Sequence, residues 1–353
     1  MSEKKALIAM SGGVDSSVAA FLTKEEGFDC IGGTMRLCDH LLPEPGTAPE
    51  DAAAVAHKLG MPFHCFDNTK DFTEHVVEDF IRSYELGLTP NPCVCCNRHL
   101  KFGILLQQAQ ALGCSYIVTG HYAVIRLDAE TGRYLLCKAA DKAKDQSYVL
   151  SCMTQEQLAH THFPLGALSK DQVRKIAEEQ GFVTAKKRDS QDICFIPDGD
   201  YRSFMERYTD KTYPGGDYLD QSGNKVGKHT GAVSYTIGQR KGLGLALGAP
   251  VYVLSKDMER NTVTVGPDAE LFRDTLIAED WNWIAIPELT APRKVLARIR
   301  YRHTEQPATV YPLADGSAKV VFEQPQRAIT PGQTVVLYDG DVVIGGGMIR
   351  KVL

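Results

Sequence analysis

The chain has 353 residues, of which 43% are hydrophobic and 24% are charged, and its formal net charge is −5 at pH 7. These values are typical of a globular protein with enough core for two or three domains. They exclude a membrane span, because the sequence has no run of about 18 apolar residues.

The N-terminal residues lead directly into a predicted strand and lack the apolar segment of a signal peptide. We therefore expect a cytoplasmic protein with no membrane partner. The negative net charge argues weakly against nucleic acid as a ligand. Residues 281–353, however, contain nine Lys and Arg against six Asp and Glu, and a local excess of this kind suits a large acidic ligand.

All ten cysteines lie within the first 194 residues. In a reducing compartment they are expected to be thiols, metal ligands or catalytic groups rather than a disulfide framework. Any sulfur chemistry is therefore expected in the N-terminal part of the chain.

A glycine-containing loop follows the first predicted strand. Residues 6–10 are apolar, residues 18–22 predict the beginning of a helix, and the sequence Ser-Gly-Gly-Val-Asp-Ser-Ser (residues 11–17) lies between them. Free N–H groups and the helix dipole make such a loop an anion site. The loop is neither a Walker A motif nor a dinucleotide fingerprint. An ordinary turn with Asp15 or Ser16 as N-cap is the alternative.

The first 200 residues alternate between predicted strands and helices. Further strands are predicted at residues 30–35, 62–66 and 116–119, and helices at residues 50–59 and 73–85, with a Pro/Gly loop at residues 42–46. The alternation predicts an α/β fold with a parallel sheet. Ligands bind beyond the carboxyl ends of such strands, so residues 12–17, Met35 and Gly120–His121 are expected at one edge. A helix that follows the capping box Ser169–Gln172 is interpreted as structural.

The pattern becomes all-β from about Tyr201. Strand-like segments occur at residues 231–236, 251–254 and 262–265, and a second β-rich unit begins near Thr275, with strands predicted at residues 294–302, 308–311, 318–322 and 334–338. We therefore predict three domains, at residues 1–200, 201–274 and 275–353.

A cysteine cluster at residues 93–96 follows two prolines. The prolines are expected to keep the chain out of a helix before the cysteines, and residues 100–112 predict a helix. Cys93 and Cys96 would then lie at a helix N-terminus, where a thiolate is stabilised and its pKa falls. Half a zinc site with His99, a thioredoxin-like pair and chance clustering are the alternatives. Cys194, in the segment 188–196, is by itself compatible with a buried strand cysteine.

These motifs resemble a known family. Ser-Gly-Gly-x-Asp-Ser resembles the pyrophosphate loop of the PP-loop ATP pyrophosphatases. Together with it, Thr-Pro-Asn-Pro-x-x-x-Cys-Asn-x-x-x-Lys-Phe (89–102), Thr-Gly-His-Tyr-Ala (119–123), Lys-Asp-Gln-Ser-Tyr (144–148), Ile-Cys-Phe-Ile (193–196), Tyr-Thr-Ile-Gly-Gln-Arg-Lys-Gly-Leu-Gly (235–244), Arg-Ile-Arg-Tyr-Arg (298–302) and Pro-Gly-Gln (331–333) are similar to the bacterial tRNA-specific 2-thiouridylases. The resemblance implies a PP-loop domain (adenine nucleotide α-hydrolase-like), a small central β domain and a C-terminal β-barrel.

The resemblance also implies a reaction. ATP would adenylate the C2 carbonyl oxygen of the tRNA wobble uridine, in the single-stranded anticodon loop, and sulfur would replace that oxygen, releasing AMP and pyrophosphate. Mg²⁺ would accompany ATP and be bound by Asp15. The implied ATP-binding residues are Ala9, Met10, Ser11, Gly12, Gly13, Val14, Asp15, Ser16, Ser17, Met35 and Gly120.

Cys96 matches the family's nucleophile, and Cys194 matches the cysteine that carries a persulfide. With Asp15 and Cys93 they form the expected catalytic set. The residues implied to contact the target base or the rest of the tRNA are Asn91, Pro92, Cys93, His121, Lys144, Asp145, Gln146, Arg300, Tyr301 and Gln333.

Cys93 departs from the family pattern, because many members have Asp at this position. Three cysteines, Cys93, Cys96 and Cys194, are then available to ligate a 4Fe–4S cluster that delivers sulfide. The alternative is a persulfide relay that ends in a Cys96–Cys194 disulfide. The sequence leaves both open, and it leaves the sulfur donor open between a protein and sulfide. Rival hypotheses are a PP-loop ligase for a small metabolite and a non-catalytic RNA-binding or iron–sulfur scaffold.

Overall fold

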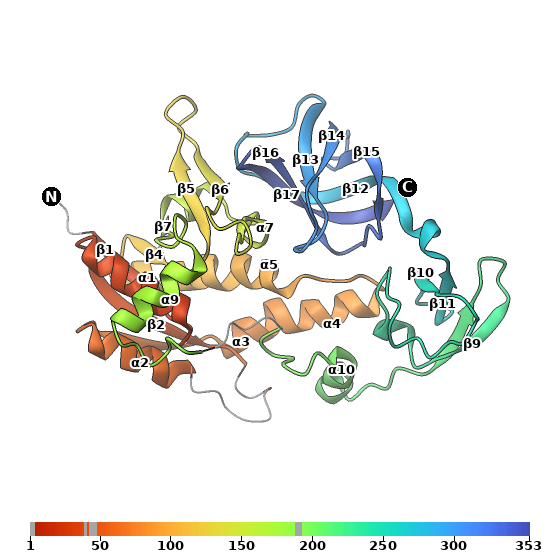
Figure 1. Cartoon of the computed structure of the whole chain (residues 1–353), viewed down its shortest axis with the longest axis horizontal. Coiled ribbons are helices and arrows are strands. Elements are labelled where there is room, and N and C mark those ends of the chain that lie inside the picture. Colours follow the sequence, from red (N-terminus) through yellow and green to blue (C-terminus); the bar gives the residue numbers. More distant parts are fainter. Residues whose placement is uncertain (1–3, 39–40, 42–47, 188–192) are drawn as a thin grey trace.

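The structure is a computed structural model that describes residues 4–38, 41, 48–187 and 193–353. The predicted loop at residues 42–46 and the first part of the segment 188–196 lie outside the described residues. The strands form a five-stranded, a four-stranded and an eight-stranded sheet. Figure 1 shows the first of these with its helices at one end of the molecule, the second at the other end, and the third above both.

The first sheet is parallel, as predicted. Its order is β3-β2-β1-β4-β7, and the apolar run Ala6–Ile8 in its central strand is fully buried. The two-residue strand β7 was not predicted. The strands are β1 (Lys5–Ala9), β2 (Asp29–Arg36), β3 (Phe63–Asp67), β4 (Tyr116–Val118) and β7 (Thr161–His162).

Helices cover both faces of this sheet. One apolar core includes residues of α1, α2 and α9, and the other includes residues of η3, α6, α7 and α8. The predicted helix at residues 73–85 is the end of a longer helical run, from α3 through the π-helical turn η2 to α4. The helices of this part of the chain are α1 (Val14–Glu25), α2 (Ala48–Lys58), α3 (Thr69–Phe72), η2 (Thr73–Val77), α4 (Glu78–Glu85), α5 (Pro92–Cys96), η3 (Asn97–Ile104), α6 (Leu105–Ala111), α7 (Ser147–Leu150), α8 (Gln155–Ala159) and α9 (Lys170–Glu179).

Residues 88–91 are not helical, as the prolines predict, but the helix begins at Pro92 and not at residue 100. Helix α5 begins at Pro92 and continues through η3 and α6, so the cysteine cluster is helical. Pro92 occupies the first helical position, where the missing N–H costs nothing and the fixed φ angle suits the helix. Asn91 is the N-cap, and its side chain accepts the N–H of Val94 at 3.4 Å.

The sheet order places a crevice beside β1. Strand β1 pairs with β2 on one side and with β4 on the other, so the connections after β1 and β4 leave in opposite directions. Ligands of parallel α/β sheets bind at such a switch point, beyond the carboxyl ends of the strands. The loop at residues 11–13 and Gly120 both lie there, as the sequence predicted.

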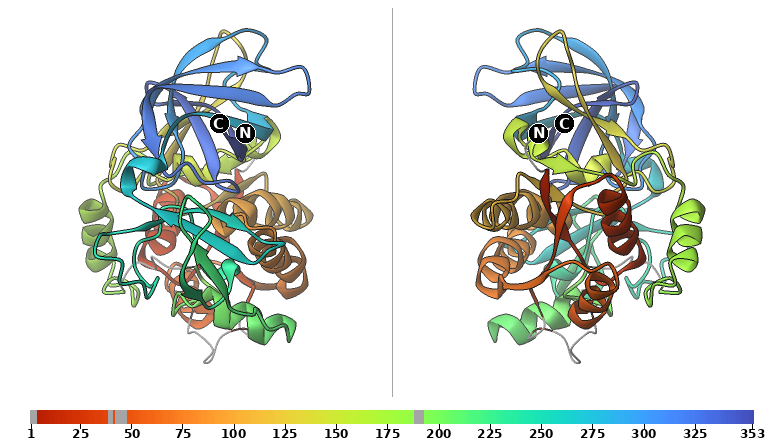
Figure 2. Two further views of the ribbon diagram at one scale, coloured as in Figure 1. Left: turned by 90° about the vertical axis from the view of Figure 1, so that its right-hand side faces the viewer. Right: turned by 90° about the vertical axis from the view of Figure 1, so that its left-hand side faces the viewer.

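A hairpin of β5 (Ala123–Leu127) and β6 (Tyr134–Lys138) leaves the α/β unit and was not predicted. It belongs to the eight-stranded sheet, because β6 pairs with β17 at Val342. Lys138 reinforces this junction, since its ammonium is 2.6 Å from Glu305 and its N–H donates to the carbonyl of Asp341. Figures 1 and 2 show the hairpin upright beside the barrel strands.

The central sheet has the order β10-β11-β8-β9, and two details differ from the prediction. Residues 201–209 form a helix, α10, because Phe204 and Met205 bury one face and Asp200 caps its start. Residues 232–234 form the 3₁₀ turn η4 instead of a strand. The elements are α10 (Tyr201–Thr209), β8 (Gly216–Leu219), β9 (Lys225–His229), η4 (Ala232–Ser234), β10 (Tyr252–Asp257), β11 (Thr262–Gly266) and η5 (Asp268–Leu271).

Six antiparallel strands close into a barrel at the C-terminal end. Strand β12 pairs with β15 on one side and with β17 on the other, which completes the circle, and the buried residues of the strands form one apolar core. The predicted strands occur here, except that the one predicted over residues 294–302 ends at Arg298 and residues 299–302 form a turn. They are β12 (Phe272–Trp283), β13 (Arg293–Arg298), β14 (Gln306–Pro312), β15 (Ala318–Arg327), β16 (Thr334–Asp339) and β17 (Val342–Val352).

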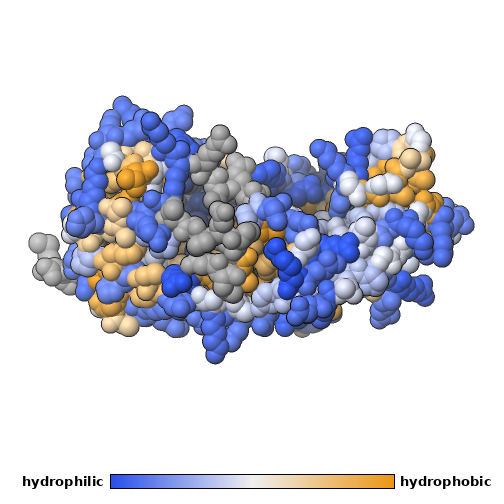
Figure 3. All heavy atoms as spheres, turned by 90° about the horizontal axis from the view of Figure 1, so that it is seen from below, coloured by the Kyte–Doolittle hydropathy of each residue, from blue (hydrophilic) through white to orange (hydrophobic). Residues whose placement is uncertain are grey.

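The lower face of the molecule is mainly hydrophilic (Figure 3). Figure 3 shows the lower face, on which apolar side chains gather in separate patches, one of them at the end that carries the central sheet. Across the described residues, no helix combines the length and the apolar character needed to cross a membrane.

Candidate active site

The loop between β1 and α1 has the backbone shape of an anion site. Gly12 has a φ angle of +67°, and a Cβ atom at this position would lie 2.4 Å from the carbonyl oxygen of Ala48. Only glycine therefore fits between the loop and the first turn of α2. Gly13 is extended and is the N-cap of α1, so the first-turn N–H groups receive no acceptor from a capping side chain.

The serines of the loop have different environments. Ser16 Oγ donates to the carbonyl of Gly13 at 3.1 Å and accepts the N–H of Ser11 at 3.2 Å. Ser17 Oγ donates to the same carbonyl at 2.9 Å and lies 2.9 Å from the hydroxyl of Thr184. Ser16 and Ser17 are buried, whereas Ser11 is exposed. The two buried hydroxyls fix the shape of the loop, and Ser11 faces solvent.

Asp15 is the charged group of the loop, and two residues hold it. Both carboxylate oxygens accept hydrogen bonds from the ammonium of Lys170, at 2.7 and 2.8 Å. The hydroxyl of Tyr122 donates to Oδ1 at 2.8 Å. The interpretation of α9 as merely structural missed Lys170, since capping-box spacing shows where a helix begins but not where its first side chain points.

Gly120 and Met35 complete the edge of the crevice. A Cβ atom on Gly120 would lie 2.7 Å from the carbonyl carbon of Asp15 and 2.8 Å from the N atom of Ser16. The segment after β4 therefore rests directly on the first turn of α1. Met35, near the end of β2, packs against the core under the sheet and also against the apolar cluster that contains Cys96.

Cys93 and Cys96 are three residues apart on α5 and so lie on one face of the helix. Cys96 is 8% exposed, whereas Cys93 and Cys194 reach the surface. The expected fall of the thiol pKa at the helix N-terminus is wrong. Burial raises the pKa of Cys96 to about 12, and surrounding protein atoms also raise the pKa of Cys93. Desolvation of the thiolate outweighs the helix dipole here.

Cys38 joins this group and was missed. The pKa of Cys194 is raised, first by a hydrogen bond with the Cys38 side chain and then by desolvation from the protein atoms around the thiol. The Cys38 thiol also lies 4.0 Å from the carbonyl oxygen of Cys194. The charges of Cys93 and Cys194 contribute to the raised pKa of Cys96. The structure therefore brings Cys93, Cys96 and Cys194 into one neighbourhood, with Cys38 behind Cys194.

The residues present fit the two expected inorganic groups differently. Mg²⁺ is commonly held by one or two carboxylates together with substrate phosphates, and the 31% exposed side chain of Asp15 at the loop meets this need. The cysteines supply the thiol donors that a 4Fe–4S cluster takes, each of which binds a different iron, but they do not form a site for a single metal ion. Within the described residues, no three His, Cys, Asp or Glu side chains are close enough to hold one metal.

Several residues expected to contact tRNA are buried instead. Asp145 is 5% exposed and accepts the N–H of Ala139 and the hydroxyl of Ser147, with Arg298 at 3.6 Å. His121 is also buried; burial lowers the pKa of its imidazole, and its Nδ1 lies 2.7 Å from the hydroxyl of Thr119.

Gln146 is likewise engaged within the protein, because its side-chain carbonyl accepts the N–H of Tyr122. These three side chains position the polypeptide around the crevice.

Two other expected contact residues, Arg300 and Tyr301, lie in the turn after β13. Tyr301 is 38% exposed in the turn after β13. Its pKa is raised, first by burial, and the neighbouring charges that affect it include Lys144 and Cys93. Arg300 is next to it, and burial lowers the pKa of its guanidinium. Tyr301, Lys144 and Cys93 therefore lie near one another.

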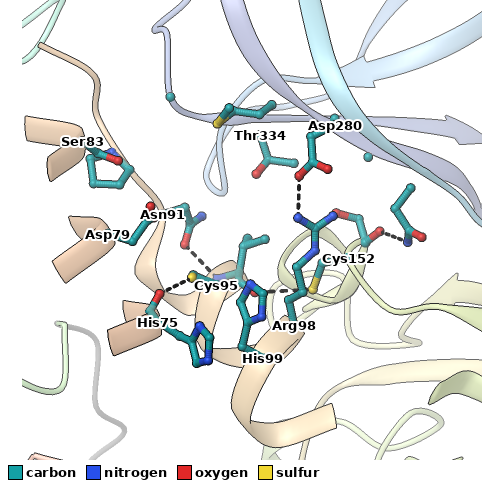
Figure 4. A pocket seen from close by; sticks show the side chains of 18 of the residues that line it. His75, Asp79, Ser83, Asn91, Cys95, Arg98, His99, Cys152, Asp280 and Thr334 are labelled. Atoms are coloured by element: carbon teal, nitrogen blue, oxygen red, sulfur yellow. Dashed lines mark hydrogen bonds and ion pairs between the residues drawn. The ribbon is translucent and has the colours of Figure 1, made fainter. Parts of the chain in front are cut away.

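A pocket opens on the opposite side of α5 from Cys93. Its volume is about 340 Å³, and Cys95, Cys152, His75, His99 and Arg98 are among its lining residues. Figure 4 shows the Cys95 thiol directed at the backbone of His75, to which it donates at 2.8 Å, and Arg98 paired with Asp280 of the barrel. No sequence signal pointed to this pocket.

Three family models together match nearly the whole chain. A family model described as the tRNA methyl transferase HUP domain matches residues 4–198, a tRNA methyl transferase PRC-barrel domain matches residues 202–267, and an aminomethyltransferase beta-barrel domain matches residues 273–349. The U34-tRNA thiolase NcsA from Methanococcus maripaludis, with its 4Fe–4S cluster, aligns with a TM-score of 0.35 and 16% identity over 58% of this chain and 66% of that one. A likeness at that level carries no argument for this chain.

Two relatives align over nearly their full length. The tRNA-specific 2-thiouridylase MnmA of Symbiobacterium thermophilum is 50% identical over 362 residues, which cover 99% of this chain and 93% of that protein. The protein of the same name from Clostridioides difficile is 47% identical over 357 residues, which cover 99% of each. The chain belongs to the tRNA-specific 2-thiouridylase family.

Proposed function

We propose that this chain converts the wobble uridine of tRNA to 2-thiouridine at the edge of its parallel sheet. Its family supports ATP-dependent thiolation of tRNA as the reaction. The site assignment rests on the contacts made by the residues at the C-terminal end of β2. Met35 belongs to the nucleotide side and packs with the Cys96 cluster, and three residues later Cys38 contacts Cys194. One strand end thus serves both the ATP loop and the sulfur-bearing cysteines.

The pyrophosphate loop activates an oxygen. The loop N–H groups and the N-terminus of α1 would hold the leaving pyrophosphate, with Asp15 as the ligand for Mg²⁺, which supplies charge neutralisation when bound. The C2 oxygen of uracil attacks the α-phosphorus, the bond to pyrophosphate breaks, and the oxygen becomes part of an AMP leaving group. Ser11 is the exposed hydroxyl of the loop, and Gly120 keeps the loop and the next strand end together.

Sulfur then replaces the adenylated oxygen. A donor persulfide transfers its outer sulfur to the Cys194 thiol and leaves as a thiol. The terminal sulfur on Cys194 attacks C2, and AMP departs. The thiolate of Cys96 attacks the inner sulfur, which releases 2-thiouridine and leaves a Cys96–Cys194 disulfide. An external thiol reductant restores both cysteines. Cys96 must lose its proton in this step, because its raised pKa keeps the free thiol neutral.

We propose the persulfide route rather than a cluster, since it uses Cys96 and Cys194 in the roles of nucleophile and persulfide carrier that the family motifs imply for them. Anaerobic purification followed by iron analysis and visible absorbance tests this choice, with Cys93→Ser as the discriminating variant. The relay predicts that iron-free protein is active with a persulfide donor and that Cys93→Ser remains active. Stoichiometric iron that is lost with activity in Cys93→Ser would replace the relay by a cluster.

The three predicted domains would divide this work. Residues 1–200 would bind ATP and carry the cysteines, residues 201–274 would form the central β unit, and residues 275–353 would contact tRNA through Arg300, Tyr301 and Gln333. Asn91 and Pro92 would approach the target base from the start of α5. Tyr301 supports this view, because an exposed aromatic ring near Lys144 suits a stacked base beside a phosphate.

Mass spectrometry of tRNA nucleosides tests the function. After incubation with ATP, Mg²⁺ and a persulfide donor, we expect 2-thiouridine, with AMP and pyrophosphate released only when tRNA is present. Cys96→Ser should form none. If neither a persulfide donor nor anaerobic sulfide yields 2-thiouridine, the proposal is overturned. Pyrophosphate release that is independent of tRNA would favour a ligase acting on a small metabolite.

A further inference from the structure

Lys170 is a buried cation at the ATP-binding edge, outside the set of ATP-binding residues expected from the family. Its side chain is 10% exposed, and its ammonium lies 2.7 and 2.8 Å from the two carboxylate oxygens of Asp15. Asp15 belongs to the first turn of α1, directly after the glycine loop. The cation therefore stands where the helix dipole and the open N–H groups already favour an anion.

The start of α9 holds the backbone of Lys170 firmly. Its N–H donates to the carboxylate of Asp141 at 3.0 Å. The preceding residue, Ser169, is the N-cap and forms a complete capping box with Gln172. These bonds leave the ammonium end as the part of the residue that is able to exchange partners.

Three segments converge on the same carboxylate. Tyr122 donates its hydroxyl to Asp15, and its ring centroid lies 5.9 Å from the Lys170 ammonium. Gly120, two residues before Tyr122, touches the backbone of Asp15 and Ser16. A change of hydrogen-bond partner at Asp15 therefore alters contacts of α1, of α9 and of the segment after β4.

The pair is unequal in exposure. The Asp15 side chain is 31% exposed, about three times the value for Lys170. An ion pair whose role was only to stabilise the fold would not need one of its two groups to be accessible to a ligand. Here the carboxylate opens toward the loop, while the ammonium supports it from inside. A polyphosphate in the loop would bring further negative charge close to a lysine that has three rotatable donors.

We propose that Lys170 is a polyphosphate-binding residue of the ATP site, which neutralises Asp15 in the free chain and donates to a phosphate oxygen when ATP is bound. When Asp15 turns to Mg²⁺, the buried ammonium of Lys170 would be left without a compensating negative charge, which is costly. A phosphate oxygen of ATP supplies that charge, so Lys170 is expected to change its partner from Asp15 to the phosphate. The inference deepens the proposed function and rests on its use of ATP.

Binding to the full chain in the absence of tRNA tests the proposal. Isothermal titration would compare ATP, inorganic pyrophosphate and adenosine, with and without Mg²⁺. In Lys170→Met we expect ATP and pyrophosphate to bind about tenfold more weakly or worse, as for the loss of one charge-assisted hydrogen bond. Adenosine has no phosphate and should bind as in the wild type. Lys170→Arg should retain part of the affinity.

Lys175→Met is the matched control. Lys175 lies on the same helix, is 76% exposed and pairs with Glu179 at 3.8 Å, so its loss should change none of the three affinities. If Lys170→Met does not fold, the double variant Asp15→Asn/Lys170→Met removes both charges and is compared with Asp15→Asn alone. A further loss of pyrophosphate affinity in the double variant supports the proposal.

The proposal is overturned if folded Lys170→Met, or the double variant against Asp15→Asn, binds ATP and pyrophosphate with unchanged affinity. It is also overturned if adenosine binding falls by the same factor as ATP binding, because the lysine then acts on the fold and not on the phosphates. These outcomes are independent of 2-thiouridine formation. A chain that binds pyrophosphate through Lys170 but does not thiolate tRNA would contradict the proposed function alone.

Discussion

The side-chain amide of Gln333 donates a hydrogen bond to the carbonyl oxygen of Thr89 at 2.8 Å and so joins the barrel to the segment that leads into α5. The same amide lies 3.3 Å from the carbonyl of Pro90, and the N–H of Thr89 donates to Pro331 at 2.9 Å. Gly332 packs so closely that a Cβ atom there would be 2.8 Å from the Thr89 N atom. Gln333, expected to touch tRNA, thus also holds the start of the cysteine helix.

Gln333→Ala should slow thiolation more than it weakens ATP binding. Two backbone carbonyls lose their donor, which costs about 1–2 kcal/mol at this contact, and α5 loses its fixed position relative to the barrel. Single-turnover formation of 2-thiouridine and ATP affinity are the measurements. Gln324→Ala, at an exposed position of β15, is the control and should leave both unchanged. Equal thiolation rates in both variants would contradict a positioning role.

Neighbouring cysteines of α5 should differ sharply in function. Cys96→Ser should abolish formation of 2-thiouridine, because an alkoxide cannot take the place of the thiolate in disulfide exchange. Cys95 lies on the other side of the helix and donates to the carbonyl of His75, so Cys95→Ser should remain close to wild-type activity. Nucleoside mass spectrometry compares the two. A dead Cys95→Ser variant with an intact fold would move the sulfur path to the pocket of Figure 4.

Gly120→Ala should impair ATP binding at the crevice. The added Cβ atom would collide with backbone atoms of Asp15 and Ser16, at 2.7 and 2.8 Å, and backbone gives way less easily than a flexible side chain. Overpacking of this kind costs about 1–3 kcal/mol of stability. It would also displace the first turn of α1, so that its N–H groups no longer point at the phosphates. Titration with ATP and thermal unfolding measure the two effects. Wild-type ATP affinity in this variant would show that the contact is not needed.

His303 should make barrel stability depend on pH. Its Nε2 donates to the side-chain carbonyl of Gln326 at 3.2 Å, and its Nδ1 accepts the N–H of Ile299 at 3.5 Å, an arrangement that requires the neutral ring. Burial, followed by the charge of Arg300, lowers its pKa to about 4. The unfolded ring titrates near about 6.5, so the unfolded chain binds the proton more readily. The stabilisation is complete above about pH 6.5 and is lost as the pH falls toward 4.

Thermal unfolding between pH 7.5 and 4.5 tests this. We expect His303→Gln to lose less stability than the wild type over the window, by about 1–2 kcal/mol after solvent screening. His57→Gln, at an exposed position of α2, should keep the wild-type pH profile. Parallel profiles for the wild type and His303→Gln would refute the assignment.

Local patterns predicted the parts of the site that depend on local structure. An apolar run, two glycines and a helix start were enough to place the loop at residues 11–13, and the β/α alternation put Gly120 at the same edge. Lys170 was missed because its partner Asp15 is 155 positions away in the sequence. Cys38 was missed for the same reason, since its contact with Cys194 spans 156 positions.

Two further errors have clear physical causes. The helix of the cysteine cluster begins at Pro92 and not at the predicted residue 100, because a proline is favourable at the first helical position. The thiol pKa values of Cys93 and Cys96 were expected to fall with the helix dipole. The protein atoms around these two thiols come from tertiary packing that no spacing of cysteines reveals, and the desolvation they cause raises the pKa values instead.

The pairing of β6 with β17 determines what the connecting segments control. Longer linkers near residues 200 or 274 would not let the barrel move away from α5, because the hairpin of the first unit is hydrogen-bonded into the barrel sheet and Thr89 is bonded to Pro331 and Gln333. The spacing between the ATP edge and the expected tRNA surface is therefore set by strand pairing, and linker length is free to vary without changing it.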